Sequence, residues 1–191
     1  MKSFKQLSAA LALTSLATIA AAAPQTYVID SSHTFPRFSY SHFGYSTQLS
    51  SFSNTQGKVV FDAEARTGSV EVEIDIKSVN TGFADFNGHL QGEDFLDTAR
   101  FPKATFKSTR VVFEGDKPKA IEGQLTIKGV TKPVTLTVTS FQAMPHPMVK
   151  KPAIGANAFT QIKRSEFNAG KYVPYVGDDV RIDIAIEAIA P

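Results

Sequence analysis

The 191-residue sequence contains no cysteine and no tryptophan. The absence of cysteine excludes disulfide bonds, thiolate metal sites, iron–sulfur clusters and cysteine nucleophiles, so packing and backbone hydrogen bonds must stabilise the fold. Phenylalanine, in contrast, occurs 15 times. Rings this large and apolar must lie in a core or against an apolar ligand. The length, with 42% hydrophobic and 20% charged residues, fits one globular domain of ordinary size.

Residues 1–22 contain no acidic residue and are predicted to form a secretory signal peptide. Two lysines, Lys2 and Lys5, precede an apolar run that ends in small alanines, which is the order that signal peptidase substrates share. We expect cleavage after Ala22, leaving residues 23–191 as a single domain. A membrane anchor is the alternative, but the run is interrupted by serine and threonine, and a spanning helix needs about 20 apolar residues. We therefore expect a periplasmic or secreted protein without a stable membrane anchor.

The charge balance gives no electrostatic reason to bind a polyanion. Loss of residues 1–22 removes two of the 20 basic residues and leaves 18 against 18 acidic ones. A near-neutral chain has neither the basic footprint of a nucleic-acid-binding protein nor a polybasic patch for anionic lipid headgroups. Nucleic acid is therefore excluded as an expected partner.

Apolar and polar residues alternate along much of the chain, which predicts β-strands with one apolar face. The clearest segments are 70–76, 121–128, 134–139 and 180–187. Weaker segments are 37–43, 57–62, 104–114 and 156–163. In segment 104–114, Phe106 and Phe113 would point to opposite faces of a regular strand, which predicts either a bulge or a strand with two apolar faces. Pro36 cannot donate a ladder hydrogen bond, so the first of these strands is expected to begin at Arg37 or to pair from a sheet edge.

One segment has helical rather than alternating spacing. Between residues 82 and 96, the apolar positions Phe83, Phe86 and Leu90 are three and four residues apart, which predicts a short helix. About eight antiparallel strands and one helix favour a closed barrel, because closure removes exposed sheet edges. An eight-stranded barrel is filled by side chains or holds one slim ligand. Gly123 and Gly129 are expected to open space inside it, and both interiors remain alternatives at this point.

No catalytic or cofactor motif is present. The sequence has no serine elbow, no phosphate-binding glycine loop and no zinc-binding His-Glu-x-x-His helix, so we expect neither an enzyme nor a cofactor. One pattern suggests a soft metal instead: Met144, His146 and Met148 alternate with prolines. Thioether and imidazole donors suit copper, although the prolines favour a geometry that scatters the side chains. A stiff loop is the alternative.

Several motifs in fixed order resemble the YceI-like lipid- and polyisoprenoid-binding family. They are HTFPRF at 33–38, HFGYS at 42–46, NGHL at 87–90, DFLD at 94–97, FPKATFKS at 101–108 and GQLTIKGVTKPV at 123–134. The resemblance covers nearly all of residues 23–191. It implies an extended, lipocalin-like antiparallel β-barrel with a helix near one end, a long apolar tunnel and no firmly attached catalytic activity. It also allows a homodimer, for which the sequence shows no interface signature.

The resemblance and the strand parities together give a set of expected ligand-binding residues. Those expected at the entrance or upper tunnel are His42, Phe43, Tyr45, Phe83, Phe86, His89, Leu90, Phe95, Leu96 and Phe101. Those expected to face the chain farther inside are Phe38, Tyr40, Leu125, Ile127, Leu136, Val138, Ile182 and Ile184.

The leading hypothesis is a non-catalytic carrier of a long apolar chain, such as a polyisoprenoid, an isoprenoid quinone or a fatty amide. Two rival functions remain. One is an enzyme that modifies such a lipid with His42 or His89 as acid or base. The other is a copper-binding protein that uses the methionine and histidine pattern at 144–148.

Overall fold

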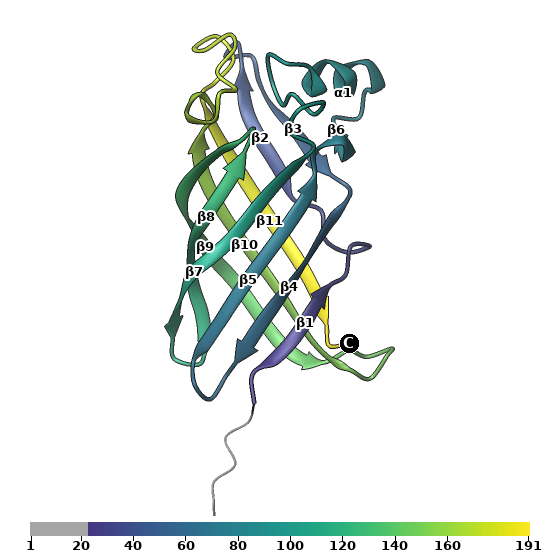
Figure 1. Cartoon of the computed structure of the whole chain (residues 1–191), viewed down its shortest axis with the longest axis vertical. Helices are drawn as coiled ribbons and strands as arrows, with labels where there is room; N and C mark the ends of the chain where they lie inside the picture. The colour runs from purple at the N-terminus through teal and green to yellow at the C-terminus, as the bar shows by residue number, and fades with distance from the viewer. Residues whose placement is uncertain (1–22) are drawn as a thin grey trace, which may run out of the picture.

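The computed structural model describes residues 23–191, which form antiparallel strands over most of their length (Figure 1). The predicted signal peptide lies outside the described residues. The strands are β1 (Gln25–Ile29), β2 (Arg37–His42), β3 (Ser46–Phe52), β4 (Thr55–Asp62), β5 (Thr67–Asp75), β6 (Val79–Asn80), β7 (Lys103–Glu114), β8 (Lys117–Ile127), β9 (Val130–Pro145), β10 (Pro152–Lys163) and β11 (Asp179–Ile189). The helical segments are the 3-10 turns η1 (Ile76–Ser78) and η2 (Arg164–Phe167) and the helix α1 (Ala84–Gln91).

Eight of these strands close into an antiparallel barrel. The hydrogen-bonded order is β1-β4-β5-β7-β8-β9-β10-β11, and β11 returns to β1 through Val28↔Ile189 and Ile29↔Ala188. The predicted fold class is therefore confirmed. Strand β1 pairs with the C-terminal part of β11, whereas β2 pairs with its N-terminal part, for example at Ser39↔Arg181. Strand β3 then pairs with β2, and β6 pairs with β3. Two short strands thus share one long neighbour and together complete that wall.

The predicted strands are all present, but membership of the ring differs from the prediction. Strand β2 lies beside the eight-stranded ring, and β1, which was not predicted, belongs to it. Strands β3 and β6 were not predicted either. Strand β2 begins at Arg37, as expected from Pro36. The predicted bulge in β7 is confirmed, because its pairing with β8 shifts register between Ser108 and Arg110.

The helix is shorter than the predicted 82–96 segment. It ends at Gln91 because Gly92 adopts an extended backbone conformation (φ −65°, ψ 164°). Residues 92–98 then turn back on α1, and the Leu96 amide donates to the Leu90 carbonyl at 3.0 Å. Helix α1 lies at the same end of the barrel as the segment between η2 and β11, opposite the C-terminus (Figure 1). None of the helices in residues 23–191 is long and apolar enough to cross a membrane.

Aromatic rings occupy the space beside two glycines of the barrel wall, where other residues would carry a side chain. At Gly123 a Cβ atom would lie 2.4 Å from Cζ of Phe106, and at Gly129 it would lie 2.7 Å from Cε1 of Phe101. The expectation that these glycines widen the interior is therefore wrong. They let aromatic rings lie flat against the strands.

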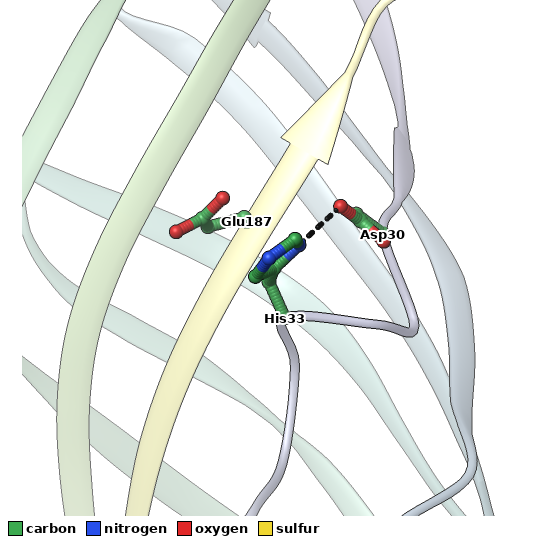
Figure 2. A group of neighbouring side chains, drawn as sticks. All are labelled: Asp30, His33 and Glu187. Carbon is green, nitrogen blue, oxygen red and sulfur yellow. Dashed lines mark hydrogen bonds and ion pairs between the residues drawn. The ribbon is translucent and has the colours of Figure 1, made fainter.

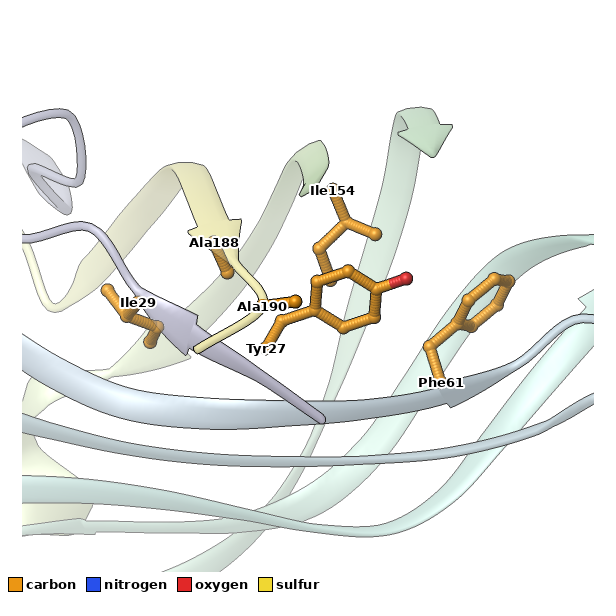
Figure 3. Packing of buried hydrophobic residues seen from close by; sticks show 6 residues of the cluster. All are labelled: Tyr27, Ile29, Phe61, Ile154, Ala188 and Ala190. Atoms are coloured by element: carbon orange, nitrogen blue, oxygen red, sulfur yellow. The ribbon is translucent and has the colours of Figure 1, made fainter. Parts of the chain in front are cut away.

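Aromatic and aliphatic side chains pack together at the barrel end away from α1. Figure 3 shows Tyr27, Phe61 and Ile154 turned toward one another, with the small Ala188 and Ala190 behind them. Ala188 is fully buried and stands where β1 meets β11. A small side chain at this closure point lets the two strands approach while the larger residues fill the barrel end.

Candidate functional site

A cavity of about 440 Å³ lies inside the barrel. Its size falls in the range of sites that hold small molecules, roughly 300–1,000 Å³. Inward side chains of the strands form its walls and are predominantly aliphatic. Those facing it from the middle of the barrel include Val59, Val70, Val72, Ile121, Leu125, Leu136, Val138, Ala158, Ile182 and Ile184. Because successive side chains of a strand point to opposite faces, the alternating segments put their apolar residues here and their charged residues in solvent.

The cavity reaches the surface at the end that carries α1. Phe43 and Tyr172 line the cavity, and each is 52% exposed. Helix α1 contributes Phe86, His89 and Leu90 to the same rim. An imidazole connects the rings of this rim, because the ring centroid of His89 lies 5.8 Å from that of Phe86 and 4.8 Å from that of Phe95. The mouth is therefore lined by aromatic side chains, some of which are partly exposed to solvent.

Three phenylalanines meet at the opposite end. The ring centroids of Phe61 and Phe141 are 4.9 Å apart, and those of Phe61 and Phe113 are 6.1 Å apart. Phe61 and Phe141 line the cavity. The barrel interior is therefore not filled by side chains. It holds an apolar cavity with aromatic residues at its mouth and at its opposite end, which we call the floor.

Two hydroxyl groups face this apolar space without a partner. Tyr40 and Thr55 both line the cavity and are 8% and 1% exposed. The Thr55 hydroxyl is fully buried and has no hydrogen-bond partner. Among residues 23–191, the Tyr40 side chain has ring and packing contacts but no hydrogen bond. Burial raises the pKa of Tyr40, and the nearby charge of Arg164 partly offsets that shift. Both groups are therefore neutral donors aimed at the interior.

Arg164 brings a positive charge to the same cavity. Its guanidinium group donates to the carbonyl oxygens of Gly177 at 2.8 Å, Val176 at 2.7 Å and Lys171 at 2.9 Å, and also to that of Ala169. No carboxylate of the described chain forms an ion pair with it. Burial lowers the pKa of Arg164, but the group remains cationic because arginine titrates far above neutral pH.

The two histidines of the rival enzyme hypothesis both line the cavity. His42 packs edge-on against Phe43 with ring centroids 4.4 Å apart, and His89 lies among phenylalanine rings. In the part of the chain that the structure describes, neither imidazole hydrogen-bonds a side chain that could orient it. A general acid or base normally has such a partner, so this arrangement gives the enzyme hypothesis no support.

The structure brings fifteen of the eighteen expected ligand-binding residues to the cavity lining. They are Phe38, Tyr40, His42, Phe43, Phe86, His89, Leu90, Phe95, Leu96, Leu125, Ile127, Leu136, Val138, Ile182 and Ile184. Their contact with a ligand stays a prediction. The lining follows from the strand parities for the wall residues and from the family motifs for the mouth residues.

Three expected residues lie elsewhere. Tyr45 is 92% exposed, because the turn between β2 and β3 directs it away from the barrel. Phe83 precedes α1 and is 64% exposed. Phe101 covers Gly129 and lies under the guanidinium of Arg100, whose Cζ is 5.1 Å from the ring centroid. None of these three rings lines the cavity, and their contact with a ligand stays a prediction.

Other lining residues were missed by the sequence reasoning. Phe61 and Val59 share one parity of β4, so the alternation in that strand could have identified them. Thr55 lies on the same face of β4, but because it is polar, the apolar pattern did not identify it as a lining residue. Arg164 gave no signal either, since a charged residue after a strand is usually solvated.

One group of side chains could hold a cation by its composition. Ligand atoms of Asp30, His33 and Glu187 all lie within 4.8 Å of one another (Figure 2). His33 Nδ1 is 2.7 Å from Asp30 Oδ2, and the Ser32 hydroxyl donates to Asp30 Oδ1 at 2.6 Å. These contacts already satisfy the carboxylate, so the group is accounted for as an ion pair that closes the turn after β1.

The methionine and histidine pattern at 144–148 spans the end of β9 and the turn that follows it. Met144 lies near the end of β9, whereas Met148 is 81% exposed in the following turn. The His146 Nδ1 atom accepts hydrogen bonds from the backbone amides of Met148 and Val149 at 3.2 and 3.3 Å. These bonds stiffen the turn, as the loop interpretation expects, and copper binding stays untested.

The geometry agrees with what comparison with known proteins finds. Residues 27–188 match the model of the YceI-like domain. This chain belongs to the YceI-like family. A UPF0312 protein of Shewanella denitrificans is 35% identical over 190 residues, which cover 97% of this chain and 98% of that protein. Protein YceI of Salmonella arizonae is 36% identical over 177 residues, with 91% and 92% covered.

Solved structures of other proteins share the barrel fold. BcnA of Burkholderia cenocepacia superposes with a TM-score of 0.70 at 27% identity, over 84% of this chain and 99% of that one. A polyisoprenoid-binding domain from Saccharophagus degradans superposes with a TM-score of 0.64 over 87% and 99%, at 17% identity, so that likeness concerns the fold alone. Both proteins therefore have the same overall fold as this chain.

Proposed function

We propose that this YceI-like protein is a non-catalytic carrier that holds one long apolar chain lipid inside its barrel. The observation that carries the proposal is the cavity itself: aliphatic walls, an aromatic mouth beside α1 and a floor of phenylalanine rings. The polyisoprenoid-binding domain with the same fold makes an isoprenoid chain the first candidate. An isoprenoid quinone or a fatty amide would use the same walls.

The energetics favour this assignment. Burial of hydrocarbon contributes about 0.8 kcal/mol per CH₂-sized group. Association and ordering cost roughly 4–15 kcal/mol. For a chain of several isoprene units, the free energy gained by burial exceeds this cost, so binding is favourable. Walls that recognise only shape and apolarity discriminate weakly between chains, and the carrier is expected to accept a range of them.

We further propose that the protein works in the periplasm. The support is the pattern of residues 1–22, in which two lysines precede an apolar run that ends in alanines. Cell fractionation of the full-length chain tests this, because retention of the uncleaved chain in the cytoplasm would contradict it. A homodimer stays a prediction of the family resemblance, and analytical ultracentrifugation would test it.

The decisive experiment is native mass spectrometry of the purified protein, with extraction and identification of any bound lipid. Ala158 lines the cavity from β10, so Ala158→Phe should fill the apolar space and remove the bound lipid. Ala185 lies on β11, outside the cavity lining and opposite Asn157, so Ala185→Phe is the matched control and should retain it. Lipid-free wild-type protein from lipid-rich cells, or equal loading of both variants, would contradict the proposal.

A further inference from the structure

Unpartnered polar groups inside an apolar cavity are costly. An amide or hydroxyl group without a hydrogen bond in such surroundings is less stable than the same group in water. A pure hydrocarbon ligand would make this cost permanent, because it would exclude the water that could satisfy such a group. Tyr40 is the polar group of this kind that has a charged neighbour in the same cavity.

The position of Tyr40 is fixed by its neighbours. It lies on β2 between Phe38 and His42, which share its inward face, and its ring stacks on Phe38 with a centroid distance of 6.3 Å and an interplanar angle of 14°. Val176 and Val180 pack against it in the same buried cluster. With the ring held in this way, the hydroxyl faces the cavity and remains free to donate.

The charge beside it is held just as firmly. The guanidinium of Arg164 donates to carbonyl oxygens of the segment between η2 and β11, which lies at the α1 end of the barrel. These carbonyls accept its hydrogen bonds without neutralising it. The Asp178 carboxylate is near enough to raise the pKa of Arg164, but it forms no ion pair with the guanidinium among residues 23–191. Tyr40 and Arg164 line the same cavity, and the Arg164 charge partly offsets the rise in the Tyr40 pKa that burial causes. A positive field next to a free donor favours an electron-rich oxygen.

We propose that the Tyr40 hydroxyl, beside Arg164, hydrogen-bonds to a carbonyl or carboxylate oxygen in the head of the bound lipid. The inference rests on the proposed function and narrows the ligand class: the cargo is an apolar chain that carries one acceptor head. The head lies on the mouth side, where Tyr40 and Arg164 are, and the tail runs toward Phe61 and Phe141. A headless hydrocarbon would fill the walls but leave Tyr40 unpaired.

Two ligands with the same isoprenoid chain test the inference. Farnesoic acid carries a carboxylate head and farnesene carries none, and both can displace the fluorescent dye N-phenyl-1-naphthylamine from an apolar site. In Tyr40→Phe, which removes only the hydroxyl oxygen, the ratio of the two dissociation constants should move about tenfold against the acid. Affinity for farnesene should stay the same.

Tyr27 supplies the matched control. It is also a buried tyrosine, 7% exposed and with its pKa raised by burial, but its side chain does not line the cavity. Tyr27→Phe should therefore leave the ratio unchanged. An unchanged ratio in Tyr40→Phe would overturn the inference while leaving the carrier function intact. Failure of the dye and of farnesene to bind wild-type protein would overturn the carrier function itself.

Discussion

Single small residues decide where large rings can lie in this barrel. Gly123 has the ring of Phe106 and the carbonyl oxygen of Lys107 within 2.6 Å of the place where a Cβ atom would be. Gly123→Ala should therefore lower the free energy of unfolding by about 1–3 kcal/mol, because ring and backbone must both shift. Urea denaturation measures this. The control is Gly88→Ala in α1, where nothing lies within 4 Å and alanine should be neutral or stabilising.

The contact between His33 and Asp30 should make stability depend on pH. Hydrogen bonds from Ser32 first, and then from His33, lower the pKa of Asp30 from 3.8 to about 2. The bond to Asp30 raises the pKa of His33 above 6.5. The histidine contribution is therefore present below pH 6.5 and is lost as the pH rises through the raised value. The aspartate contribution is present above pH 3.8 and is lost as the pH falls toward 2.

We expect His33→Ala to lower the melting temperature more at about pH 5 than at about pH 9, because the contribution of the protonated imidazole is lost as the pH rises through its raised pKa. His146→Ala is a suitable comparison, because His146 has only backbone amides as partners and no carboxylate. A His33→Ala effect of equal size at both pH values would show that the contact stabilises the turn without any charge.

Residues that follow the alternation of their strand could be predicted, and residues that break it could not. Leu125 and Ile127 share one parity of β8, and Ile182 and Ile184 share one parity of β11, so the apolar pattern placed all four inside. Thr55 occupies an inward position that the pattern reserves for apolar residues. Its cost is visible only in three dimensions, as a hydroxyl without a partner.

Among the elements, the segment between η2 and β11 depends on one side chain. Four of its carbonyl oxygens accept hydrogen bonds from the Arg164 guanidinium. Lysine keeps the charge but cannot reach several carbonyls at once. Arg164→Lys should therefore lower the local opening free energy of residues 169–177 by about 2 kcal/mol, which corresponds to roughly 30-fold faster amide exchange.

Hydrogen exchange followed by mass spectrometry resolves this segment from the strands. Arg181→Lys is the matched control, because Arg181 lies on the outer face of β11, with its Cζ 4.1 Å from the ring centroid of Phe159. It should leave the exchange of residues 169–177 unchanged. If exchange in that segment is equally slow in Arg164→Lys, its order comes from packing of Phe167 and Val176 and not from the arginine.

The same scale shows why some elements escaped prediction. In β3 the pattern is inverted, since Leu49 is 60% exposed and Ser50 is 4% exposed. No rule that places apolar residues inside can find such a strand. Its position follows instead from the ladder that it completes between β2 and β6. Helix α1 was found by its spacing, but its end was not, because Gly92 stops it through backbone conformation.

At the scale of the whole molecule, the phenylalanine rings at the closed end of the barrel limit the length of the cavity. Phe141 lines the cavity and packs against Phe61, so its ring occupies space that a longer ligand tail would need. Phe141→Ala should deepen the cavity and shift the lipids that co-purify with the protein toward longer chains. The loss of stability should be about 3 kcal/mol, the lower end for such a truncation, because Phe141 is only half-buried.

Extraction of the bound lipids and mass spectrometry of their chain lengths give the readout, with Phe159→Ala as the control. Phe159 comes from neighbouring β10 and is also half-buried, but it lies outside the cavity lining under Arg181. Its truncation should cost stability without altering the chain-length distribution. If Phe141→Ala binds the same lipids as wild type, the floor does not limit the cargo, and chain length must be set at the mouth.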